Sequence, residues 1–285
     1  MLERDGYPPG GPCWVDTGQP DPEAAAGFYG DLFGWKLEDR MPPDAPGRYL
    51  VAQLRDRDVA AVGSQPEGAP ATPGWNTYIC VESADQAATK VTNAGGQVLS
   101  APFDVPGAGR MGVFADPSGA AFCVWEAREH KGAQLVNEPG TWVFSGLNTR
   151  DLDGAKAFYG AVFGWEVDTL TMEDGDEFMF WRLPGYADFL AARDPDLRRR
   201  QAADGAPAGY ADAVASLAPM TGFPDEVPPH WSVTFAVDDA DGIADRAAQL
   251  GGKISVPPFD AGPTRLAILA DPQGAAFAVS KYQPA

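Results

Sequence analysis

Few side chains in this 285-residue sequence could carry acid–base chemistry, and the best placed are Asp16 and Tyr78. Each lies in a short strand-like run. A buried Asp16 would serve as a general base, because desolvation raises the pKa of a carboxyl group toward neutrality. The alternative is a carboxylate that accepts hydrogen bonds from the local backbone, and the sequence favours that interpretation. Asp16 and Tyr78 are therefore the candidate catalytic residues.

The three cysteines offer a second kind of chemistry, nucleophilic attack by a thiolate. Cys80 and Cys123 have no histidine or lysine nearby in the sequence that would activate them, and a buried thiol is normally inert. Cys13 and the other two show no C-x-x-C spacing, and an odd number without a framework fits a reducing compartment. We expect inert thiols and a cytoplasmic protein.

A binding site for a small molecule is predicted from the alternation of side chains along the strands, which places every second residue on one face. In the first half of the chain this face combines aromatic walls with polar tips, a typical composition for a ligand pocket. The alternative for Trp14 and Trp125 is that they belong to the core. The candidate ligand-binding residues are Trp14, Asn76, Cys123 and Trp125, and in the second half Phe144, Asn148, Ser232 and Thr234.

Composition excludes several partners. The net charge of −19 argues against binding to nucleic acid or to an anionic membrane, since both require clustered cations. No apolar run approaches the ~18 residues of a membrane span, and residues 1–11 read as a Pro/Gly-rich arm rather than a signal peptide.

The elements that must position these residues occur twice. Asp21–Trp35 and Asp151–Trp165 share the pattern D-x-x-x-A-x-x-F-Y-G-x-x-F-G-W, which predicts a helix that starts at the aspartate and stops at the second glycine. Two later pairs repeat as well, Gly95-Gly96 with Gly251-Gly252, and a D-P-x-G turn at Asp116 and Asp271. Each half therefore reads as strand, helix and three strands, twice over.

The repeat sets the expected domain boundaries. We expect a first domain at 12–126, a linker at 127–141 and a second domain at 142–282, with an insertion at about 192–229. Within the insertion, Asp196–Ala203 and Tyr210–Leu217 are predicted as two short helices. Each domain could complete its own cleft, so a monomer or a homodimer is expected.

These motifs resemble the vicinal oxygen chelate superfamily, which includes glyoxalase I, bleomycin-resistance proteins and extradiol dioxygenases. The resemblance implies an α+β fold of two tandem domains, each pairing two βαβββ modules into a curved mixed sheet around a cleft. Metal-using members hold a divalent ion there with His, Gln or Glu. The matching positions in this sequence are Trp14, Asn76 and Cys123 in the first domain, and Phe144, Ser232 and Ala278 in the second.

The residues at those positions are poor ligands. Indole, phenyl and methyl groups cannot bind an ion, and an amide beside a thiol is an unsuitable pair for Mg²⁺, Fe²⁺ or Zn²⁺. His130, in the linker, and His230, at the edge of a strand, are expected at the surface. We therefore expect neither a metal nor another cofactor.

Three hypotheses about function follow. The first is a metal-independent protein of the glyoxalase/bleomycin-resistance type that binds an apolar or aromatic metabolite or antibiotic. The second is a natural-product tailoring enzyme, of a hydroxylase or isomerase type, that works without the chelated ion. The third is an interaction protein whose clefts are filled. Whether the protein is an enzyme is left open by the sequence.

Overall fold

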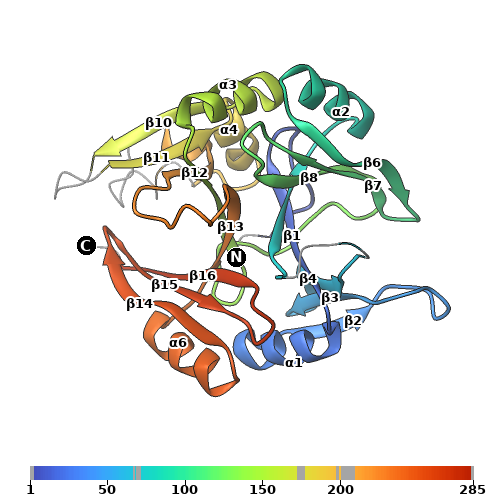
Figure 1. Ribbon diagram of the computed structural model, residues 1–285, viewed down its shortest axis with the longest axis vertical. Coiled ribbons are helices and arrows are strands. Elements are labelled where there is room, and N and C mark those ends of the chain that lie inside the picture. Colours follow the sequence, from blue (N-terminus) through green and yellow to red (C-terminus); the bar gives the residue numbers. More distant parts are fainter. Residues whose placement is uncertain are drawn as a thin grey trace.

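A computed structural model describes residues 3–66, 68, 72–171, 177–196, 199 and 209–283. The chain forms two eight-stranded mixed sheets with helices packed against them (Figure 1). The first sheet has the strand order β2-β3-β4-β1-β5-β8-β7-β6, and the second repeats it as β10-β11-β12-β9-β13-β16-β15-β14. The identical orders confirm the α+β fold of two tandem domains of paired βαβββ modules.

The first domain contains two modules. The elements of the first are β1 (Pro12–Gln19), α1 (Pro22–Phe33), β2 (Lys36–Asp39), β3 (Tyr49–Leu54) and β4 (Arg57–Ser64). Those of the second are β5 (Trp75–Cys80), α2 (Ala84–Asn93), β6 (Gln97–Val105), β7 (Gly109–Ala115) and β8 (Ala121–Ala127). Antiparallel pairing of β1 with β5 joins the modules into one sheet.

The second domain repeats this order with additional chain. Its first module holds β9 (Trp142–Thr149), α3 (Leu152–Phe163), β10 (Glu166–Thr171), β11 (Glu177–Arg182), α4 (Tyr186–Ala191), the 3₁₀ turn η1 (Tyr210–Asp212) and β12 (Ala213–Pro219). Its second holds β13 (His230–Ala236), α6 (Ala240–Gln249), β14 (Lys253–Ala261), β15 (Thr264–Ala270) and β16 (Ala276–Tyr282).

The repeated helices begin and end where their capping residues require. Asp21 Oδ1 accepts the backbone N–H of Ala24 at 3.0 Å, and Pro22 opens α1, where its missing N–H costs nothing. Gly34 ends the helix with φ +73°, a left-handed conformation that favours glycine. Asp151 and Gly164 do the same for α3, so this expectation from the sequence is confirmed.

The insertion differs from our expectation. In the first domain, residues 55–56 join β3 to β4, whereas residues 183–212 join β11 to β12. The additional chain therefore starts earlier than 192 and ends before 229. The helix expected at Tyr210–Leu217 is wrong, because only Tyr210–Asp212 turn and the rest is strand β12, which pairs with β9 and β11. Sheet pairing on both sides overrides the local helix propensity of this alanine-rich run. The helix expected at Asp196–Ala203 lies mostly outside the described residues.

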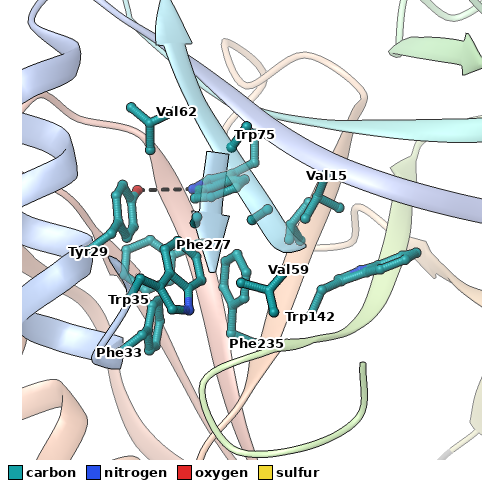
Figure 2. Packing of buried hydrophobic residues seen from close by; sticks show 14 of the residues in the cluster. Val15, Tyr29, Phe33, Trp35, Val59, Val62, Trp75, Trp142, Phe235 and Phe277 are labelled. Carbon is teal, nitrogen blue, oxygen red and sulfur yellow. Dashed lines mark hydrogen bonds between the residues drawn. The ribbon is translucent and has the colours of Figure 1, made fainter. Parts of the chain in front are cut away.

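The hydrophobic cores are shared between the domains. Helix α1 lies beside α6 of the second domain, and α2 lies beside α3 (Figure 1). Phe28 of α1 packs edge-on against Phe277 of β16, with ring centroids 6.4 Å apart. Figure 2 shows Trp35 and Trp75 of the first domain gathered with Phe235 and Phe277 of the second. The repeated aromatic motif therefore forms the interface between the two halves.

The N-terminal arm (residues 3–11) and the linker (residues 127–141) play equivalent parts in this interface. Trp35 Nε1 donates to Gly140 O at 2.7 Å, and its repeat partner Trp165 donates to Gly10 O at 2.8 Å. Gly10 and Gly140 both have φ near +80°, which turns the chain into β1 and β9. The arm and the linker are thus packed segments of the fold.

Candidate ligand-binding sites

A cluster of hydrogen-bonded side chains, the Asp16 cluster (Asp16, Tyr49, Asn76 and Tyr78), occupies the concave face of the first domain. The register of β1 with β5 sets Asp16 opposite Asn76. The two oxygens of Asp16 accept three hydrogen bonds: from Tyr78 Oη at 2.7 Å, Tyr49 Oη at 2.9 Å and Asn76 Nδ2 at 2.9 Å. Asp16 is only 5% exposed. Its carboxylate therefore accepts side-chain donors, rather than backbone N–H groups as the simpler sequence interpretation had it.

The electrostatics of the Asp16 cluster follow from burial. Desolvation raises the pKa of Asp16, although the hydrogen bonds from Asn76, Tyr78 and Tyr49 lower it in part. Burial, together with the negative charge of Asp16, raises the pKa of Tyr49 and Tyr78 well above the ordinary value. Both tyrosines stay protonated and keep their hydroxyl hydrogens directed at the carboxyl group.

Large side chains fill the rest of this concave face. Trp14 Nε1 donates to Tyr49 Oη at 3.0 Å, and Trp125 Nε1 donates to His130 O at 2.8 Å. Trp14, Cys123 and Trp125 are all buried, and desolvation raises the pKa of the Cys123 thiol. Trp14 and Trp125, the aromatic candidates of the first domain, are therefore covered by other residues of the protein.

The linker closes this face. The ring of His130 lies edge-on to Trp14 with centroids 4.5 Å apart, and Ala133 N donates to Cys13 O at 2.8 Å. The expectation that His130 lies at the surface is wrong, since the ring is half-buried between two indoles and burial lowers its pKa. His230 does lie at the start of β13, where its Nδ1 is 2.9 Å from Pro228 O.

The donor set on the concave faces does not fit a divalent ion. Both oxygens of Asp16 are engaged by hydrogen bonds, and its nearest companions are phenol, amide and thiol groups. In the part of the chain that the structure describes, three His, Cys, Asp or Glu side chains nowhere lie close enough to share an ion. A site with about three imidazole or carboxylate ligands, as catalytic metals require, cannot be assembled from these residues.

The concave face of the second domain carries much smaller side chains. At matching positions of the repeat, Gly146 replaces Asp16 and Thr234 replaces Tyr78, while Ala278 and Ser280 replace Cys123 and Trp125. Here Asn148 Nδ2 donates to Ser232 Oγ at 3.2 Å, and Ser232 Oγ donates to Gly146 O at 3.2 Å. Phe144, Asn148, Ser232 and Thr234 are all partly exposed. This face is therefore the more open of the two.

A pocket of about 1090 Å³, the arm pocket, opens at one end of that face. The parallel register of β12 with β9, which pairs Ser216 with Gly146, brings Val214 beside Phe144 there. The N-terminal arm, the linker, α4 and η1 complete the walls. The side chains that define its chemistry are Arg4, Tyr7, Trp142, Phe144, Tyr186 and Tyr210.

The wall that the arm provides is fixed by hydrogen bonds. Arg4 N donates to Gln134 O at 2.8 Å, and Tyr7 Oη donates to Ala133 O at 2.7 Å. An ion pair of 2.7 Å between Asp5 and Arg193 ties the arm to the chain that follows α4. The arm is thus held from both sides of the pocket.

The structure divides the predicted site residues into three groups. Trp14, Asn76, Cys123 and Trp125 surround Asp16 and Tyr78 in the closed first domain. Asn148, Ser232 and Thr234 lie on the open face of the second domain, and Phe144 alone among the candidates lines the arm pocket.

Sequence reasoning missed Tyr49 of the Asp16 cluster and, apart from Phe144, the aromatic walls of the arm pocket. The strand pattern could not find Tyr7, Tyr186 and Tyr210, because the arm and the insertion lie outside the repeat. The one available signal was the concentration of Tyr186, Phe189 and Tyr210 in the insertion.

The paired βαβββ modules define the fold class of the protein, and comparison with known sequences identifies its family. Residues 14–124 and 141–279 match the family described as Glyoxalase/Bleomycin resistance protein/Dioxygenase superfamily. The chain belongs to this superfamily. The part of the chain that the structure describes holds no helix long and apolar enough to cross a membrane.

Two relatives match along the whole chain. CFP32 of Mycobacterium tuberculosis, a presumed glyoxylase, is 40% identical over 287 residues, which are 100% of this chain and 99% of CFP32. The anthracycline biosynthesis protein DauV of a Streptomyces species (strain C5) is 35% identical over 294 residues, covering 98% of this chain and 96% of DauV. The relatives therefore share the two-domain organisation in full.

Solved structures agree on the fold. The Mn(II)-bound glyoxalase from Novosphingobium aromaticivorans superposes with a TM-score of 0.59 at 20% identity, over 95% of this chain and 82% of its own. The 2,3-dioxygenase LapB from Pseudomonas sp. KL28 has the same TM-score at 14% identity, over 96% and 93% of the two chains. At these identities the likeness concerns the fold alone.

Proposed function

We propose that the protein binds an aromatic, predominantly planar metabolite in the arm pocket, without a chelated metal ion. The observation that carries this proposal is the pocket itself, whose volume suits a multi-ring molecule and whose walls include five aromatic side chains. These are Tyr7, Trp142, Phe144, Tyr186 and Tyr210. Enclosure by aromatic walls with a few polar groups is the usual composition of a small-molecule site.

The comparison with DauV supports this ligand class. DauV is named for anthracycline biosynthesis, and the alignment extends over nearly all of both chains. A metabolite with fused aromatic rings would match both that name and the aromatic walls of the arm pocket. We place the protein in the cytoplasm, in keeping with its three free thiols.

A role in biosynthesis also favours a second candidate, a tailoring enzyme. Asp16 and Tyr78 were its candidate catalytic residues, but the side chains that line the arm pocket include neither. Each already uses its polar atoms within the Asp16 cluster. The geometry therefore supports binding better than turnover by these two residues.

A matched pair of tryptophan variants tests the proposal. Ala211→Trp places an indole in the arm pocket, whereas Leu99→Trp adds the same group at a position that is 54% exposed on β6. With 1,8-dihydroxyanthraquinone as the probe, we expect saturable quenching of tryptophan fluorescence for the wild type and for Leu99→Trp, and none for Ala211→Trp.

Metal independence is tested on the same samples. We expect the dissociation constant to stay unchanged after treatment with a chelator, and elemental analysis to find less than one equivalent of transition metal. Absence of saturable binding by fused-ring probes would refute the binding proposal. Loss of binding after chelation would refute its metal-free part.

A further inference from the structure

We propose that Arg4 of the N-terminal arm anchors an acidic oxygen of the ligand, a carboxylate or an ionised phenol, inside the arm pocket. This inference rests on the proposed function, and it adds the polar group by which the pocket selects among aromatic molecules. It makes the arm a part of the binding site, although the arm lies outside both βαβββ repeats.

Arg4 is held rigidly at the pocket wall. Its backbone N–H bonds to Gln134 O at 2.8 Å, and the preceding residue, Glu3, forms an antiparallel bridge with Leu135 of the linker. Arg4 Nε is buried and has no hydrogen-bond partner. A buried donor without an acceptor destabilises the protein, and an oxygen atom of a ligand would remove this cost.

The other charged side chains that line the pocket already have partners. Glu3 pairs with Arg57 at 3.5 Å, Arg193 pairs with Asp5 at 2.7 Å, and Glu138 pairs with Arg55. Among the described residues, Arg4 forms no ion pair. Its guanidinium group, which stays charged at any pH the protein experiences, is therefore the positive charge left for a ligand.

Tyr186 lies close enough to Arg4 for the positive charge of Arg4 to affect the pKa of its hydroxyl group. Burial raises the pKa of Tyr186, and the positive charge of Arg4 lowers it in part. The hydroxyl stays protonated at neutral pH and can donate a second hydrogen bond. A guanidinium and a phenol that line the same pocket suit an anionic oxygen, since hydrogen bonds to charged groups are about twice as strong as neutral ones.

The wall behind Tyr186 suits the ring of such a ligand. The rings of Tyr186 and Phe189 are nearly parallel, with 12° between their planes, and the guanidinium of Arg193 lies 4.0 Å from the Phe189 centroid. Helix α4 therefore presents a rigid stack, and the Asp5–Arg193 pair links this stack to the arm that carries Arg4. The stack that would contact the rings of the ligand and the arginine that would bind its acidic oxygen are therefore connected.

The net charge of −19 makes a local positive group important for the binding of an anionic ligand. An anionic ligand is repelled by the protein as a whole, so its binding depends on a local positive group. A ligand that keeps the same rings but lacks the acidic group would lose this contact and keep the aromatic ones.

Two probes with one ring system test the role of Arg4: 2-anthracenecarboxylate and the neutral 2-anthracenemethanol. For the wild type we expect the carboxylate to bind at least about tenfold more tightly. In Arg4→Gln the carboxylate should lose about tenfold to a hundredfold in affinity, as expected for hydrogen bonds to a charged group, while the alcohol changes less than about threefold. Arg4→Lys should fall between, because it keeps the charge without the planar fork.

Arg40→Gln is the matched control, since it removes the same charge from an exposed pair with Glu38. It should leave both affinities unchanged. Equal binding of the two probes, with no effect of Arg4→Gln, would overturn the anchor while leaving the aromatic pocket intact. Failure of the wild type to bind either probe would overturn the proposed function as well. Retained binding of the alcohol by Arg4→Gln shows that the variant's pocket is folded.

Discussion

The hydroxyl group of Tyr29, on helix α1 of the first domain, donates a hydrogen bond of 3.0 Å to Asp271 Oδ2 in the second domain. Trp75 Nε1 donates to the same hydroxyl at 3.0 Å (Figure 2), so a chain of bonds runs from indole to phenol to carboxylate. The repeat builds this chain a second time, with Tyr159 donating to Asp116 at 3.2 Å. The tyrosine of each F-Y-G motif therefore locks its helix to the D-P-x-G turn of the other domain.

Removal of the Tyr29 hydroxyl group should show how much these hydrogen bonds between the domains contribute to stability. Tyr29→Phe leaves Trp75 Nε1 without its acceptor and takes one of two side-chain donors from Asp271 Oδ2, the other being Gln19. We expect the free energy of unfolding to fall by about 2–3 kcal/mol, measured by urea denaturation. The control Tyr282→Phe, at a ring that is 50% exposed, should change it by less than ~0.5 kcal/mol. Equal effects of the two variants would show that the lock contributes little.

The shared cores predict that neither domain is stable alone. A fragment of residues 1–138 would expose the face of α1 that packs on Phe277, and the remainder would expose the α3 face that packs on Phe122. We expect each fragment, produced separately, to be unfolded or self-associated, and the two fragments produced together to form a 1:1 complex. Light scattering after size exclusion measures this. A separate fragment that is monomeric and unfolds cooperatively would contradict the prediction.

Much of the fold could be predicted from sequence because it follows from local sequence preferences, and the same preferences recur in both halves of the chain. Asp21, Pro22 and Gly34 fix the ends of α1 by capping and backbone preference, and the same rules act on α3. The repeat could not reveal which surface each helix covers. The apolar stripe of Phe28 looks the same whether it packs within one domain or between two.

The candidate site was harder to predict, for a related reason. Strand alternation correctly placed Trp14, Asp16 and Asn76 on one face, yet alternation says nothing about how full that face is. The large residue that completes it, Tyr49, comes from β3 and fits because Gly63 opposite has no side chain; a Cβ there would lie 3.1 Å from the Tyr49 ring. Arg4 and Tyr210 lie in segments without periodicity, so only tertiary structure brings them together.

The repeated Gly-Gly pair provides a test of packing between the domains. A Cβ on Gly96 would lie 2.7 Å from Ala115 O and 2.7 Å from Phe158 Cε2 of the other domain. We expect Gly96→Ala to reduce the free energy of unfolding by about 1–3 kcal/mol, because it overpacks the core. Gly27, exposed on α1 with open space around it, is the matched control. Gly27→Ala should stabilise the protein by about 0.5–1 kcal/mol through helix propensity, and chemical denaturation of both variants checks the two signs.

The Asp16 cluster predicts an unusual dependence of stability on pH. Because the pKa of Asp16 is raised in the folded state, the folded protein binds this proton more tightly than the unfolded chain does. The contribution of Asp16 to stability is therefore full below the ordinary carboxyl pKa of about 4, and it is lost as the pH rises through the raised value. Between pH 7 and pH 4, the wild type should gain stability relative to Asp16→Asn as the pH falls.

Asp39 provides the opposite case. The backbone N–H of Met41 and the guanidinium of Arg48 lower the pKa of this half-buried carboxyl group. Its contribution is present at neutral pH and is lost as the pH falls through the lowered value, so the wild type should lose stability relative to Asp39→Asn below pH ~4. Urea midpoints of the three proteins across this range measure both differences. Parallel curves for the wild type and Asp16→Asn would mean that Asp16 titrates alike in both states, and that its three hydrogen bonds fully offset its burial.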